Sequence, residues 1–156
     1  MNVSCDMSTD ETSFLDGYLP YLLRRADQTL SAPFYALLAQ YGVALSEWRV
    51  LAVLHELGEL CVADLAEAAL SVQPTVTHAS RRLEDRGLLS SAPGTDDKRQ
   101  RFLSITAAGT SLISTLIEKA KQLEADALSE AGDLSDLIQQ LQELTANVHQ
   151  RGTSYA

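Results

Sequence analysis

Basic side chains are concentrated in one short part of this acidic chain. Residues 81–101 hold six of the twelve Lys and Arg residues against four acids, whereas the rest of the chain has six bases and seventeen acids. The net charge of −9 opposes binding to nucleic acid, but the distribution of charge decides where an anion binds. The pattern predicts a local anion-binding edge, with acidic flanks that oppose non-specific binding.

A helix expected over residues 72–86 leads into this basic segment. Ser71 is the expected N-cap, which puts Pro74 in the first turn, where proline is tolerated, and Gly87 ends the helix. A helical wheel predicts an inward apolar stripe, formed by Val72, Val76, Ala79 and Leu83.

The opposite face of this helix carries the side chains that could contact DNA. Short hydroxyls approach bases or phosphates closely, their methyl groups can meet thymine methyl groups, and Arg can contact guanine or phosphate. A solvated face without a ligand is the alternative for the same residues. The candidate DNA-contacting residues of the helix are Pro74, Thr75, Thr77, His78, Arg81 and Arg82.

The elements around this helix follow a recognisable order. Apolar residues at helical spacing predict a long helix over 17–40, which Pro33 must kink or split, and Ser46 is expected to cap a helix over 47–57. A compact helix over 62–69 precedes the break at residues 70–71. After residue 87, two strands over 88–92 and 101–105 form a hairpin, Thr106 caps a helix through about Ala131, and a last helix runs to about His149.

Composition excludes several classes of protein. No apolar run approaches membrane-spanning length, and the polar, acidic start is unlike a signal peptide, so we expect a cytoplasmic protein without a membrane partner. Two cysteines form neither a disulfide framework nor a zinc site, and the three histidines are scattered, so no metal or cofactor is expected. The sequence offers no nucleophile–base constellation, which argues against an enzyme.

Four motifs, in order and at proper spacing, resemble the MarR (multiple antibiotic resistance regulator) family. The resemblance covers about residues 45–115. It is carried by residues 45–51, 64–67, 73–78 with 82–89, and 96–99 with 103–109. It implies a mainly α fold, a winged helix-turn-helix with a two-stranded β-wing between N- and C-terminal dimerisation helices.

The resemblance also implies roles for residues outside the helix over 72–86. Arg99 would enter the minor groove, oriented by Asp97, and Lys98 would contact phosphate; a plain polar hairpin loop is the alternative. Family members often bind small aromatic anions in a crevice between the reading head and the long helices. Residues that could line it are Tyr18, Tyr21, Arg25, Trp48 and His55. Trp48 is better explained as core, and packing at a dimer interface explains the tyrosines at least as well.

We therefore expect a homodimeric, DNA-binding transcriptional repressor that a small aromatic acid releases from a palindromic operator. The expected domains are an N-terminal dimerisation helix (14–45), a winged helix-turn-helix (46–106) and C-terminal dimerisation helices (107–152). One alternative is a winged helix used only for protein–protein contact. Another is a thiol-based redox regulator that uses Cys61, near the start of the third helix, where a small buried hydrophobe is the simpler interpretation.

Overall fold

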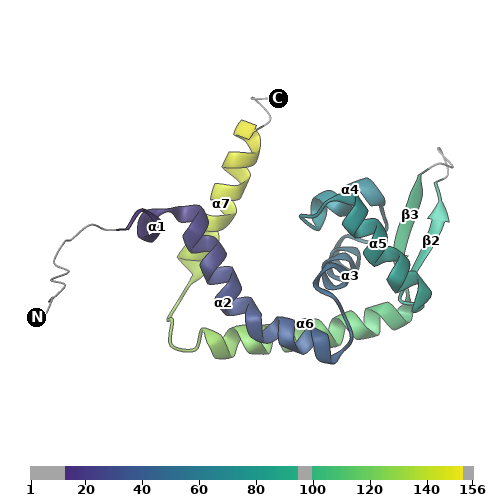
Figure 1. The fold of residues 1–156 in the computed structure, drawn as a ribbon, viewed down its shortest axis with the longest axis horizontal. Helices are drawn as coiled ribbons and strands as arrows, with labels where there is room; N and C mark the ends of the chain where they lie inside the picture. The colour runs from purple at the N-terminus through teal and green to yellow at the C-terminus, as the bar shows by residue number, and fades with distance from the viewer. Residues whose placement is uncertain (1–12, 95–99, 153–156) are drawn as a thin grey trace, which may run out of the picture. The chain divides into compact units, whose positions relative to one another are not determined.

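The computed structural model describes residues 13–94 and 100–152, which are mainly helical (Figure 1). The chain forms two compact units, which divide after residue 120. In chain order the elements are α1 (Phe14–Gly17), α2 (Leu19–Gln40), α3 (Leu45–Leu57), β1 (Leu60–Cys61), α4 (Val62–Ala68), α5 (Gln73–Asp85), β2 (Leu89–Pro93), β3 (Arg101–Ile105), α6 (Ala107–Ala127) and α7 (Ser135–Gly152).

No single helix in the described ranges is long and apolar enough to cross a membrane. The pair α2 and α3 meets that test together by length and composition, but the two helices are bent by 95°.

Three helices end in the same hydrogen-bonded turn. After α2 and α5, the amides of the two residues that follow the C-cap donate hydrogen bonds to carbonyls of the last helical turn. The first of these two residues has a positive φ and is a glycine, Gly42 or Gly87. After α4 the same turn forms, with Leu70 N–H on Glu67 O and Ser71 N–H on Ala66 O. Here the left-handed residue is Leu70, at φ 51°, which costs about 1–2 kcal/mol relative to glycine.

The start of α3 differs from the sequence prediction. The helix begins at Leu45 with Ala44 as its N-cap, so the prediction that Ser46 caps it is wrong. The Glu47 carboxylate accepts a hydrogen bond from the Ala44 N–H at 2.9 Å and so satisfies a donor that no helical carbonyl can reach. The Glu47 side chain, in the first turn of α3, therefore determines that the helix begins at Leu45.

The start of α5 also differs. Its N-cap is Val72, not Ser71, because the Ser71 amide belongs to the turn that ends α4. Val72 is 65% exposed, so its predicted place in the inward stripe is wrong, whereas Val76, Ala79 and Leu83 are buried as expected. Pro74 lies in the first turn as predicted.

The sheet has one strand more than the predicted wing. Strands β2 and β3 form the expected antiparallel hairpin, with Leu89 opposite Ile105 and Pro93 opposite Arg101. The short strand β1 pairs with the other edge of β3, Cys61 opposite Phe102, so the order is β1-β3-β2. This pairing ties the start of α4 to the base of the wing.

One apolar core supports these elements. It joins α3, α4, α5, the sheet and the first half of α6, and Figure 1 shows α3, α4 and α5 gathered beside the β2–β3 hairpin. The core residues with less than a tenth of their surface exposed are Val50, Leu51, Leu54, Leu65, Ala66, Val76, Ala79, Leu83, Leu88, Leu89, Leu103 and Ile113. Helix α5 and the β2–β3 hairpin are therefore held on a packed scaffold.

The junction between the hairpin and α6 is close-packed. Thr106 caps α6 as predicted, since its hydroxyl accepts from the Gly109 N–H at 3.1 Å and donates to the Gly87 carbonyl at 2.8 Å. A Cβ at Gly109 would lie 2.2 Å from the Leu88 carbonyl oxygen, so only glycine fits without movement of the backbone. The helix ends at Ala127, four residues before the predicted end at Ala131.

Helix α2 is continuous through Pro33 and is not split. Its C-terminal part buries Phe34 and Leu38, but its first three turns leave the apolar stripe exposed.

At the start of α7, the Ser135 hydroxyl and amide both donate to Asp133, and these hydrogen bonds lower the pKa of the Asp133 carboxyl.

Candidate nucleic-acid interface

The outer face of α5 is polar and basic. Pro74, Thr75, His78 and Arg81 are exposed there, while the opposite face packs into the core. With α4 and the turn at Leu70, this forms a helix-turn-helix followed by a hairpin. Such modules place the exposed face of the second helix in the major groove of DNA.

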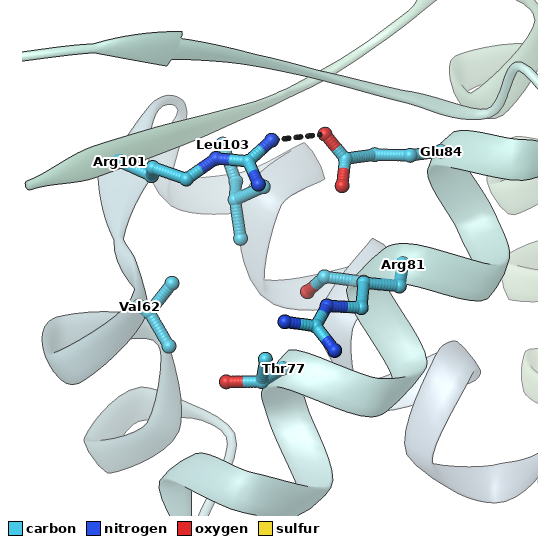
Figure 2. A pocket seen from close by; sticks show the side chains of 7 residues that line it. Val62, Thr77, Arg81, Glu84, Arg101 and Leu103 are labelled. Carbon is cyan, nitrogen blue, oxygen red and sulfur yellow. Dashed lines mark hydrogen bonds and ion pairs between the residues drawn. The ribbon is translucent and has the colours of Figure 1, made fainter.

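Thr77 and Arg81 border a small cavity beside the wing. Figure 2 shows both side chains directed from α5 toward Val62 of α4 and toward β3. The cavity has a volume of about 100 Å³, and its lining also includes Ser80 and Leu103. Ser80 is only 3% exposed, and its hydroxyl has no hydrogen-bond partner among the described residues.

An ion pair connects the wing to α5 across this cavity. The Arg101 Nη2 on β3 lies 3.1 Å from the Glu84 Oε1 (Figure 2). The same nitrogen also donates to the Ser91 hydroxyl of β2. Both partners are partly solvated, so the pair adds little to stability. The pair holds the base of the wing at a fixed distance from α5 and so fixes the wing relative to the outer face of that helix.

A buried glutamate holds the other end of α5, a feature that the sequence interpretation missed. Glu47 on α3 is fully buried; its Oε2 accepts from Arg86 Nη1 at 3.3 Å, and its Oε1 lies 3.0 Å from Arg82 Nε in an ion pair without hydrogen-bond geometry. Arg86 also donates to the Gly42 carbonyl at 3.0 Å. The available signal was an acid in the first turn of α3, on the side of the helix that carries Val50, Leu51 and Leu54, together with two arginines four residues apart on another helix.

Arg82 is thus placed differently from the other predicted DNA contacts. Its Nε faces Glu47, although 53% of its side chain remains exposed. Its role in DNA contact stays a prediction. The ion pair with Glu47 gives the same side chain a structural role. The wing-tip residues Asp97, Lys98 and Arg99 lie outside the described residues.

The five predicted ligand residues do not line a common cavity among the described residues of a single chain. Tyr18 is the N-cap of α2, and Tyr21 and Arg25 lie one turn apart in that helix, where Arg25 borders an open apolar hollow. Trp48 instead packs edge-on against Phe34, with ring centroids 4.7 Å apart, in agreement with the core interpretation. His55 is exposed near the end of α3, and the ligand set stays a prediction.

Cys61 is a half-buried free thiol in β1 and is the N-cap residue of α4. Its backbone pairing with Phe102 accounts for its position in the fold, and a redox role stays untested.

A protein-family model matches the part of the chain that contains the helix-turn-helix. The MarR family model covers residues 43–100, from just before α3 to the hairpin. The HTH-type transcriptional regulator FarR of Neisseria gonorrhoeae is 31% identical over 108 residues, which span 69% of this chain and 73% of that protein. The homoprotocatechuate degradative operon repressor of Escherichia coli is 27% identical over 132 residues, 82% of this chain and 88% of that protein.

Solved structures share the fold. The crystal structure of NadR in complex with 4-hydroxyphenylacetate superimposes with a TM-score of 0.73 and 28% identity, covering 91% of this chain and 97% of that one. The similarity therefore extends well beyond the helix-turn-helix.

Proposed function

Because the chain belongs to the MarR family of winged-helix transcriptional regulators, we propose that it represses transcription by binding a specific duplex through the outer face of α5. The residues proposed to contact bases or phosphates are Pro74, Thr75, Thr77, His78 and Arg81. Family membership sets aside the alternative of a winged helix used only for protein–protein contact.

The division of α5 into two faces carries this proposal. Val76, Ala79 and Leu83 fix the helix on the core, and Glu47 pairs with Arg82 and Arg86 at its C-terminal half. These contacts leave the N-terminal half and the outer face free to meet a ligand. Pre-positioned donors lose little conformational entropy on binding, so a rigid helix can distinguish one sequence from another.

We further propose that the functional unit is a homodimer on a palindromic operator. Apolar side chains on α1 and α2, among them Phe14, Leu19 and Leu22, are exposed in the single chain, and a second copy would bury them. Two recognition helices related by a two-fold axis match half-sites about one helical turn apart. By resemblance, Arg99 of each wing would enter the flanking minor groove. We also propose that the protein acts in the cytoplasm, as expected from its sequence.

Selection from a randomised duplex library tests the proposal. The purified chain is expected to enrich an inverted repeat whose half-sites are about 10 base pairs apart. Enrichment must fall as salt rises, because phosphate contacts release counterions. Recovery of the library without any enriched sequence would contradict the proposed function.

We propose a small aromatic acid as the effector, since the similar NadR structure contains 4-hydroxyphenylacetate. Arg25 is the cation proposed to meet the carboxylate, because an anion buried without a partner costs several kcal/mol. Two chains would have to complete the site, as the described cavities of one chain bring in only Arg25 from the predicted set.

The effector proposal is tested by release of the enriched duplex. Salicylate or 4-hydroxyphenylacetate at millimolar concentration is expected to release DNA from the wild type but not from Arg25→Ala. Arg24→Ala, the neighbouring exposed arginine, is the matched control and should respond like the wild type. An identical response of Arg25→Ala and the wild type would place the effector elsewhere.

A further inference from the structure

Two exposed apolar side chains stand at the leading end of α5. Leu70, in the turn after α4, is 89% exposed, and Val72, the N-cap of α5, is 65% exposed. Neither belongs to the core that holds the helix. They precede Gln73 and Pro74, which are also exposed, so the apolar surface is continuous with the polar outer face of α5.

Both residues depart from what the local backbone favours. The equivalent turns after α2 and α5 have glycine at the left-handed position, whereas this turn has Leu70 at φ 51°. Val72 occupies an N-cap without offering a side-chain acceptor to the first amides of the helix, a position that Ser, Thr, Asp or Asn would stabilise. Local preferences that are broken at exposed positions point to a role in function rather than in folding.

The surroundings indicate the occupant of this surface. The next exposed side chains along α5 are Thr75, His78 and Arg81, which suit DNA, and the N-terminal end of a recognition helix is the part that enters the major groove. The major groove also displays an apolar group, the C5 methyl of thymine, which an aliphatic side chain can contact.

We propose that Val72 contacts a thymine methyl group in each half-site and that Leu70 extends this apolar contact over the neighbouring deoxyribose. The inference rests on the proposed function and adds two specificity-determining residues to it. The selected operator must then contain thymine at the position facing the start of α5, where removal of one methyl group weakens binding.

Replacement of single thymidines by deoxyuridine in the enriched duplex removes only that methyl group. At one position in each half-site, this change is expected to weaken binding of the wild type by about threefold to tenfold. Val72→Thr keeps a methyl group and should retain the response, whereas Val72→Ser should lose it. Both variants supply an N-cap hydroxyl and should raise the melting temperature, so they differ only in the contact under test.

Three further variants complete the test. Val72→Ala should lose the deoxyuridine response as Val72→Ser does, without a polar group. Leu70→Gly should raise the melting temperature and weaken binding of the enriched duplex. Leu57→Gly, at another exposed leucine at the end of α3, should leave duplex affinity unchanged.

The inference is overturned if the wild type ignores every deoxyuridine substitution, if Val72→Ser and Val72→Ala respond as the wild type does, or if Leu70→Gly binds the duplex unchanged. A wild type that enriches no duplex at all would instead contradict the proposed function, and this inference with it.

Discussion

At the scale of single residues, Glu47 shows how a structural contact and a binding surface compete for the same side chains. Two arginines of the basic segment, Arg82 and Arg86, are directed to this buried acid rather than only to solvent. Sequence reasoning could count the bases near α5 but could not tell which of them face inward, because that depends on α3, 39 residues away. His78 and Arg81 remain exposed on the outer face, where we propose that they contact DNA.

Glu47→Gln is expected to lower the free energy of unfolding by about 1–3 kcal/mol, since it removes the charge that pairs with two arginines. Solvent around Arg82 and Arg86 limits the loss. Chemical denaturation measures the change, with Glu56→Gln, an exposed acid on the same helix, as the control. Equal stability of Glu47→Gln and the wild type would show that the ion pairs contribute nothing.

At the scale of elements, periodicity and glycine positions were sufficient for most of the fold. Helices α2 to α7 and the hairpin were predicted, and Gly87 follows the end of α5 as expected. Strand β1 was missed because a two-residue strand is defined by its pairing with β3 some 40 residues later. The predicted caps at Ser46 and Ser71 were wrong because Glu47 and the turn at Leu70 shift each helix start by one or two residues.

The junction between the wing and α6 gives a second prediction. Gly109→Ala should lower the free energy of unfolding by about 1–3 kcal/mol or more, because the added methyl group overlaps the Leu88 carbonyl and the Ile105 side chain. Thermal melting checks it against Gly17→Ala, whose added Cβ meets no atom within 4 Å. Equal melting temperatures for both variants and the wild type would contradict the close packing at this junction.

At the scale of the whole molecule, family membership and exposed apolar surface support a dimer that no single chain can display. The resemblance read from residues 45–115 was confirmed by the family comparison, whereas the ligand set, the domain boundaries and the wing-tip contacts stay predictions. Ligand residues were hardest to predict because they were drawn from α2 and α3, and a core contact such as Trp48 against Phe34 has the same sequence signature.

Dimerisation is expected at micromolar concentration. Leu22→Glu on the exposed apolar face of α2 should shift sedimentation toward the monomer, because it places a charge in the proposed interface. Leu57→Glu, at a more exposed leucine outside the proposed interface, should sediment like the wild type. A wild type that sediments as a folded monomer would refute the dimer.

The base preference of His78→Ala tests most directly whether the outer face of α5 recognises sequence. Selection from a randomised duplex library is run in parallel on the wild type, on His78→Ala and on His55→Ala, an exposed histidine of α3 outside the proposed interface. We predict that His78→Ala loses preference at particular base pairs of each half-site and that His55→Ala retains the wild-type profile. An unchanged profile for His78→Ala, or an even loss of affinity across all sequences, would contradict recognition by this side chain.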